Sequence, residues 1–529
     1  MFAFTHKRAR SLISVYSIID EKHERGEDEH VVEPQTPRQK RNTTLIYLLF
    51  VAEAMMQASL SSQVAVLVPQ ASGKCMGLDA SFLRSIFESA YCLGAACGLG
   101  WGHVTDRVGR RRVALAGLAG MGLGCIAMGF ASSFGAFAAL RCVAGAMSSA
   151  VTVSGLAMLA DSTKGASRTT TVAKLPLISA CGSIAPIAAN GLLQLSEKYA
   201  LPVFARFPGL SGQLLCAGLV ISIAIAEMFL LDETLPSARH PQCHGEQHDD
   251  SEKAAFLIHS HLDNPYDTNT IDITDALDDP SAPPRPSHIT IGHMLAAPAI
   301  LLLLASYAIL SLHASTFDIL LTHLGHTESQ HGGMGLRCDW LSLVVAALQA
   351  FAALRLLHVM PSVVEAVGLL SAYRKASLAF PVLYLAIPMI GIGITTVQAQ
   401  SAITEFISMV AISIKALYAG AAQILVLLLV LAAAPDASST GIVIGVVSIA
   451  ELFKALAVGI VGIAYYVSDD YTVGVVNFAS WAALAVIAAV GAGLSWTLRD
   501  SPRIGTDIPE GCLTWQSIFD LENGEDETI

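Results

Sequence analysis

The chain has 529 residues, of which 53% are hydrophobic and only 14% are charged, and its mean hydropathy is +0.57. Such a composition excludes a soluble globular protein. The net charge of −12 comes mainly from two acidic stretches, residues 232–290 and 499–529, so it says nothing about the charge of a substrate.

Long apolar segments recur along the whole chain. A helix needs about 20 apolar residues to cross the hydrocarbon of a bilayer, and about twelve segments meet this requirement. They lie near residues 45–69, 82–104, 113–132, 135–160, 171–195, 210–231, 293–317, 339–360, 377–396, 406–433, 441–467 and 472–496. The sequence therefore predicts an all-α integral membrane protein with about twelve transmembrane helices in two pseudo-repeated six-helix bundles.

The acidic stretches and the loop charges predict the organisation of the chain. Lys and Arg are concentrated before the first span and in alternate loops, which favours a cytoplasmic position for both termini and for the central loop. We expect the protein in the plasma or vacuolar membrane. The predicted parts are a tail at 1–43, a bundle at 44–232, a disordered acidic loop at 233–290, a second bundle at 291–497 and an acidic tail at 498–529.

Two acidic residues lie within the first two spans. Glu53 is about eight residues, or roughly 12 Å of helix, from the cytoplasmic end of the first span, deep enough to lose its water. Burial and a nearby cation such as Arg141 would act on this carboxyl group in opposite directions, as a proton-coupling site requires. Glu53 or Glu88 is therefore a candidate proton or substrate site, and the alternative is a structural ion pair or a position near the headgroups.

A charged turn, WGHVTDRVGRRRVALAG at 101–117, joins the second and third spans. Its glycines allow a close helix approach and a sharp turn. We expect Asp106 to face the N-terminus of the eleventh span, which follows Ser439, because a helix N-terminus attracts a carboxylate. A purely positive-inside anchor would need the arginines alone. The motif G-x-x-x-D-R-x-G-R-R consists of Gly102, Asp106, Arg107, Gly109, Arg110 and Arg111.

This motif resembles the signature of the major facilitator superfamily, in which the loop latches the outward-facing state. Arg141-x-x-x-Gly145 in the fourth span is similar to a second motif, whose arginine is tied to proton coupling. Gly182 and Pro186 keep part of the antiporter motif, although alanine and asparagine replace its other glycines. The DETLP ending at 232–236 is similar to that of drug:proton antiporters. Longer stretches between residues 45 and 497 resemble fungal transporters akin to zinc-induced facilitator-like proteins and tetracycline exporters.

The second half repeats the first weakly. Glu365 and Gly368 match Asp106 and Gly109 at the same spacing. Lys415 and Glu451 both fall near the middle of the membrane, so we expect a charge pair that either binds substrate or holds the helices together. In the alternative, Glu451 pairs with Lys454, three residues further along the helix.

Two further acidic residues and a histidine-rich loop complete the candidate groups. Glu227 and Asp318 lie close to span ends, where we expect them to be solvated. The central loop contains weak candidate metal ligands, but nothing in this acidic segment indicates a tetrahedral site, so we expect a flexible tether and no metal or cofactor. These weak candidates are His240, Cys243, His244 and His248.

The resemblance and the spans together favour a secondary transporter and no enzyme. No Walker-type phosphate loop occurs, which argues against an ATP-driven pump. We expect proton-coupled export of a small organic molecule by a monomer in the lipid bilayer, with no nucleic-acid partner. A uniporter or importer of a nutrient, ion or metal chelate is the first alternative, and a non-transporting sensor or scaffold is the second.

Overall fold

The structure is a computed structural model of the chain. Residues 1–42 and 43–529 form separate units. Within the described ranges every regular element is a helix and there is no strand. The structure describes residues 36–60, 80–131, 133–163, 165–183, 202–207, 209–235, 298–326, 338–397, 401–434, 439–468 and 473–498. The predicted tail at 1–43, loop at 233–290 and tail at 498–529 lie almost wholly outside these ranges.

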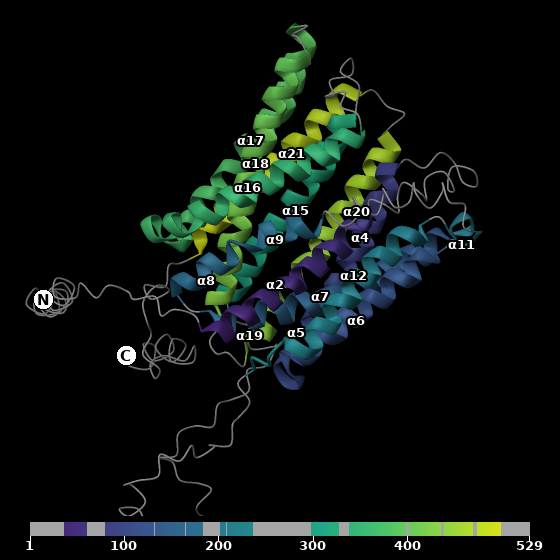
Figure 1. Ribbon diagram of the computed structural model, residues 1–529. Coiled ribbons are helices and arrows are strands. Elements are labelled where there is room, and N and C mark those ends of the chain that lie inside the picture. Colours follow the sequence, from purple (N-terminus) through teal and green to yellow (C-terminus); the bar gives the residue numbers. More distant parts are fainter. Residues whose placement is uncertain are drawn as a thin grey trace, which may run out of the picture. The chain divides into compact units, whose positions relative to one another are not determined.

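Each of the twelve expected spans coincides at least partly with a described helix (Figure 1). Eight helices or parts of helices in the described ranges are long and apolar enough to cross a membrane. The predicted all-α membrane fold is thereby confirmed. The helices are α2 (Pro37–Ala58), α4 (Ala80–Ala95), α5 (Gly98–Val108), α6 (Arg110–Gly129), α7 (Phe134–Ser162), α8 (Gly165–Val172), α9 (Leu175–Gly182), α11 (Pro202–Arg206), α12 (Leu210–Leu230), α15 (Pro298–His326), α16 (Cys338–Val367), α17 (Leu369–Val397), α18 (Ser401–Ala432), α19 (Thr440–Val447), α20 (Ala450–Ser468) and α21 (Val473–Thr497).

The first unit contributes the start of α2. Thr36 and Gln39 cap it reciprocally: the Thr36 backbone N–H donates to Gln39 Oε1 at 2.9 Å, and the Gln39 backbone N–H donates to Thr36 Oγ1 at 3.3 Å. Pro37 follows as the first helical residue, where its missing N–H costs nothing. This capping box starts the helix several residues before the predicted span.

Glycines bring the helices of the first half into close contact. Helix α6 packs between α7 and α12, and Figure 1 shows these three side by side. Helix α4 packs against α7 through Gly94 and Gly145. A Cβ on Gly94 would lie 1.8 Å from the Cys142 carbonyl oxygen, and a Cβ on Gly145 would lie 2.0 Å from the Tyr91 carbonyl oxygen. Only glycine at these positions allows the two backbones to approach so closely.

The two halves repeat their backbone turns. Gly109 between α5 and α6 has φ of 112°, and Gly368 between α16 and α17 has φ of 82°. An arginine after each turn binds the end of the last helix of its half, although the spacing differs: Arg111 donates to the Met228 carbonyl at the end of α12, and Arg374 donates to the Leu498 carbonyl beyond α21. The weak sequence repeat thus has a structural counterpart.

The second and eleventh spans are each broken, although the sequence predicted continuous helices there. The break between α4 and α5 lies at residues 96–97, and the break between α19 and α20 lies at 448–449. They face each other, because a Cβ on Gly98 would lie 2.5 Å from the Ser448 hydroxyl oxygen. Helix α5 packs on α19 and α4 packs on α20, so these two spans remain in contact on both sides of the breaks.

Candidate functional site

The Asp106 carboxylate caps the N-terminus of α19. Its Oδ1 accepts the Gly441 backbone N–H at 3.1 Å, and its Oδ2 accepts the Ile442 backbone N–H at 2.8 Å. These two N–H groups have no partner within their own helix, and the helix dipole adds attraction for a negative charge. The contact joins the first half of the chain to the second, as the sequence predicted.

Burial raises the pKa of Asp106 to about 6, while the two backbone N–H groups and Arg110 act in the opposite direction. The side chain is only 4% exposed. Only the ionised form can accept both hydrogen bonds, so the contact requires a charged carboxylate.

Arg110 lies next to Asp106 and is fully buried. Its Nη2 is 3.7 Å from Asp106 Oδ1, and its Nη1 contacts the Asp161 carboxylate and donates to the Ala157 carbonyl at 2.8 Å. A positive-inside anchor would keep its charge in water, so this burial favours the interpretation of the motif as a packed junction of α5, α6 and α7. Arg107, in contrast, is exposed.

Glu233, for which the sequence reasoning assigned no role, caps the N-terminus of α6. It accepts the backbone N–H groups of Arg110 at 3.0 Å and Arg111 at 3.2 Å. A Cβ on Gly109 would lie 2.7 Å from Glu233 Oε2, so the turn and the cap require each other. The DETLP ending was the available signal, because it placed an acidic residue just past the sixth span.

A pair of glycine motifs forms the crossing of α5 and α19. Gly98 and Gly102 on α5 face Gly441 and Gly445 on α19. A Cβ on Gly102 would lie 2.3 Å from the Gly441 carbonyl oxygen and 3.0 Å from the Gly445 Cα. Because these neighbours are backbone atoms, they cannot move aside without separating the helices.

Replacing Gly102 by Ala should therefore weaken the docking of α5 on α19 and increase access to the space between the halves from this side. Labelling of a cysteine introduced between the halves measures this access. Gly100→Ala is the matched control on the same helix, because a Cβ there would meet nothing within 4 Å. Equal labelling in the two variants would contradict the importance of this crossing.

Arg141 caps the end of α2. It is fully buried, and its Nη1 and Nη2 donate to the carbonyls of Met56 at 2.8 Å and Gln57 at 2.7 Å. Its guanidinium lies 4.5 Å from the centre of the Tyr91 ring, and its Nη2 is 3.9 Å from Glu88 Oε2. Arg141 thus satisfies carbonyl groups that α2 leaves unpaired within the membrane.

Four charged groups from both halves interact in the interior. Glu53 on α2 interacts electrostatically with Lys454, Glu451 and Glu88. Glu88 is also held at 3.4 Å by the Gln57 amide. The side chains of Glu88, Glu451 and Lys454 keep 24%, 23% and 19% exposure, although α4 and α20 pack against each other. The structure thus brings Glu53 and Glu88, two predicted site residues, close to the predicted Glu451.

The expected pair of Lys415 and Glu451 was wrong. Lys415 instead contacts the Asp318 carboxylate, and Glu451 lies 3.5 Å from Lys454, as in the alternative. Lys415 also lies 4.4 Å from the centre of the Phe317 ring. Asp318 is half exposed, in line with its expected solvation, but it lies within α15 and is paired.

An aromatic cluster around Phe317 escaped the sequence reasoning, because aromatic residues scattered over several helices have no common spacing. His313 Nδ1 and the Tyr384 hydroxyl are 2.8 Å apart, and Phe317 stacks on Tyr384 with ring centres 4.8 Å apart. Trp481 meets Phe317 edge-on. All four side chains are buried, so in this conformation the cluster is packed core.

Of the remaining predicted site residues, the structure describes some and not others. A Cβ on Gly182 would lie 2.6 Å from the Val51 carbonyl oxygen, so Gly182 allows α9 to approach α2. Glu365, the counterpart of Asp106, is exposed. Pro186 and the four weak metal candidates lie outside the described residues, and the described part contains no cluster of possible metal ligands.

Comparisons of the sequence identify a family and two relatives. The family model described as Major Facilitator Superfamily matches residues 45–492. The multidrug transporter mfsB of Aspergillus fumigatus is 22% identical over 480 residues, which cover 80% of this chain and 78% of that protein. The transporter psiT2 of Psilocybe cubensis is 24% identical over 317 residues, which cover 58% of this chain and 59% of that protein.

Solved structures share the fold. The human organic anion transporter MFSD10 superposes with a TM-score of 0.58 at 16% identity, over 87% of this chain and all of that one (100%). The proton:xylose symporter XylE superposes with a TM-score of 0.55 at 14% identity, over 87% of this chain and 96% of that one. At such low identity these likenesses concern the fold alone.

Proposed function

Because the chain belongs to the major facilitator superfamily and is therefore a multi-pass membrane transporter, we propose that it exports a small organic molecule in exchange for protons. Alternating access would rock the two halves around the interior charges. The observation that carries the proposal is Glu53, a carboxyl group of α2 that interacts with charged groups of both halves. The similarity to a multidrug transporter supports an organic substrate.

The interior charges suit a site that exchanges a proton. Lys454, the cation that acts on Glu53, also lies beside Glu451, so one positive charge is shared by at least two carboxyl groups. Because Glu53 has no cation of its own among these groups, a change in their arrangement alters how easily it holds a proton. Protonation of Glu53 shifts the balance of conformations if the two conformations differ in their affinity for the proton.

The Asp106 contact would close the cytoplasmic side during this cycle. Its hydrogen bonds hold α5 to α19, and Arg110 and Glu233 fix the loop behind it. We propose that these contacts form in the outward-facing state and break in the inward-facing state. The remaining proposed assignments follow the sequence: a monomer in the plasma or vacuolar membrane, with both termini and residues 233–290 in the cytosol.

Transport in proteoliposomes tests the coupling. The substrate would first be identified as a compound to which the chain confers resistance in a drug-sensitive cell. Antiport predicts that this compound accumulates in vesicles with an acidic interior and that reversing the gradient reverses the net flux. A flux that does not depend on the gradient would instead favour a uniporter, and the opposite dependence would favour a symporting importer.

We propose that residues 240–285 form a tether and take no part in transport. Deleting residues 240–285 should leave the flux nearly intact if the loop is a tether. Loss of the flux in the deleted protein would contradict the tether.

A further inference from the structure

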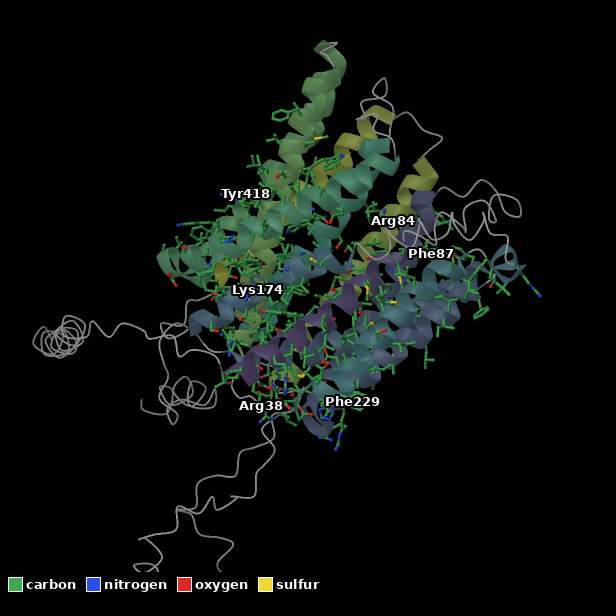
Figure 2. All side chains as sticks on the ribbon, in the orientation of Figure 1. Arg38, Arg84, Phe87, Lys174, Phe229 and Tyr418 are labelled. Atoms are coloured by element: carbon green, nitrogen blue, oxygen red, sulfur yellow. The ribbon has the colours of Figure 1, made fainter. Side chains whose placement is uncertain are left out.

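Glu227 in α12 has an environment that the proposed mechanism does not use. The sequence predicted a solvated residue, but Glu227 is 0% exposed. Neither of its carboxyl oxygens has a hydrogen-bond partner among the residues that the structure describes. The next three residues, Met228, Phe229 and Leu230, are 48%, 74% and 46% exposed, so Glu227 alone in this turn faces inward (Figure 2 marks Phe229).

The packing of α12 on α6 places Glu227 among apolar groups. The two helices are antiparallel: a Cβ on Gly129 would contact Gln213 at 3.4 Å, and one on Gly122 would contact Val220 at 3.9 Å. This register sets Glu227, seven residues after Val220 on α12, opposite Leu115, seven residues before Gly122 on α6. The flanking residues of α6, Ala114 and Leu118, are apolar and fully buried.

The charged groups near this position are the arginines at the start of α6. Arg110 points toward Asp161 and Asp106, and Arg112 is exposed. Arg111 donates to the carbonyl of Met228, the residue after Glu227, and its Nε is buried without a partner in the described ranges. Glu233 accepts the Arg111 backbone N–H. Arg111 thus binds the residue next to Glu227, and its guanidinium group is held there by a backbone carbonyl.

An ionised carboxylate without a counter-ion or a donor is too costly to bury in such surroundings, and the group takes up a proton instead. We propose that Glu227 is a second proton-binding site. It carries a proton while the cytoplasmic ends of the two halves are docked, and releases it to the cytosol when they separate and Arg111 becomes its counter-ion. The release step rests on the proposed proton-coupled transport, whereas the bound proton does not.

The end of α12 is linked through the start of α6 to the contact of Asp106 with α19. Loss of that contact therefore alters the surroundings of Glu227. Glu233 lies six residues further along the chain and caps α6, whose Arg110 contacts Asp106. Separation of α5 from α19 removes the backbone partners of Asp106 and frees the start of α6 to shift against α12. The carboxyl group and Arg111 can then meet.

Infrared spectroscopy of the full chain in lipid vesicles tests the bound proton directly. At about pH 7.5 an exposed glutamate is ionised, so a band from a protonated carboxylic acid reports buried groups. Glu227→Gln should remove part of this band from the spectrum of the wild type. Gln213→Leu is the matched control, because Gln213 is also 0% exposed on α12 and lacks partners in the described part, yet cannot titrate. An unchanged band in Glu227→Gln would overturn the proposal.

Transport at varied cytosolic pH tests the release. Where release limits the cycle, the wild-type flux should fall by up to about tenfold per unit of acidification. Glu227→Gln should lose this dependence, and Gln213→Leu should keep it. If the flux of the Glu227→Gln protein depended on cytosolic pH as in the wild type, the proposed release of the proton would be overturned. Failure of Glu227→Gln to fold would overturn the proposal that Glu227 holds a proton, because Gln matches the neutral acid in size and polarity. The infrared result stands even if Glu53 has no role in coupling.

Discussion

Replacing Glu53 by Gln is expected to abolish transport driven by a pH gradient. Each proton exchanged supplies about 1.4 kcal/mol per pH unit, so a gradient of about two units can sustain roughly a hundredfold accumulation of substrate. Gln cannot bind and release a proton, and the driving force is lost. Exchange of labelled substrate between two pools at equal pH should persist, because Gln leaves the neutral form of the site in place. The measurement is accumulation and exchange in the same vesicles.

The control for this prediction is Glu365→Gln, a change of the same chemistry at an exposed position of α16. It should leave both accumulation and exchange unchanged. Accumulation by the Glu53→Gln protein at the wild-type level would refute the role of Glu53 and move attention to Glu88 or Glu451, the other interior carboxyl groups that interact with it.

Replacing Asp106 by Asn is expected to shift the protein away from the state in which α5 is docked on α19. The carboxylate accepts the N–H groups of Gly441 and Ile442 and lies beside Arg110. Asn keeps one acceptor oxygen but turns an amide donor toward the other N–H group and removes the charge. The loss of one charge-assisted hydrogen bond costs about 2 kcal/mol, roughly a 30-fold shift between the two states.

Distances between spin labels at positions 112 and 365 report this shift. Both residues are exposed, and they lie beside the turn from α5 to α6 and the turn from α16 to α17, in opposite halves. Arg107→Gln is the control, because it removes a charge from the neighbouring exposed residue without touching α19. A distance distribution in Asp106→Asn that equals the wild type would remove the support for the latch.

Residues tied to backbone geometry were well predicted from the sequence. Gly109 and Gly368 both have the positive φ that only glycine adopts easily, and their common spacing after Asp106 and Glu365 was visible in the sequence. Asp106 could be placed opposite the eleventh span because a carboxylate and a helix N-terminus attract each other regardless of their neighbours. Apolar segment length likewise predicted where helices lie.

Residues whose role depends on helix rotation were predicted poorly. Lys415 was assigned to Glu451 on depth alone, but its neighbour is Asp318 on α15. Glu227 was expected in water because it is near a span end, but it is fully buried on α12, the helix that packs on α6. In lipid, both faces of a helix can be apolar, so hydrophobic periodicity carries little information on which face turns inward.

By itself, the amino-acid sequence determined that this is a helical membrane protein, and its charged turn identified the family, because hydrocarbon thickness and backbone strain leave few alternatives to such patterns. The tertiary structure alone decided which charges meet: Glu53 with groups of both halves, Arg141 with the end of α2, and Glu227 with no partner among the described residues. The physical reason is that these contacts depend on the rotation and register of helices distant in the chain, which close packing through glycines such as Gly102 and Gly145 determines.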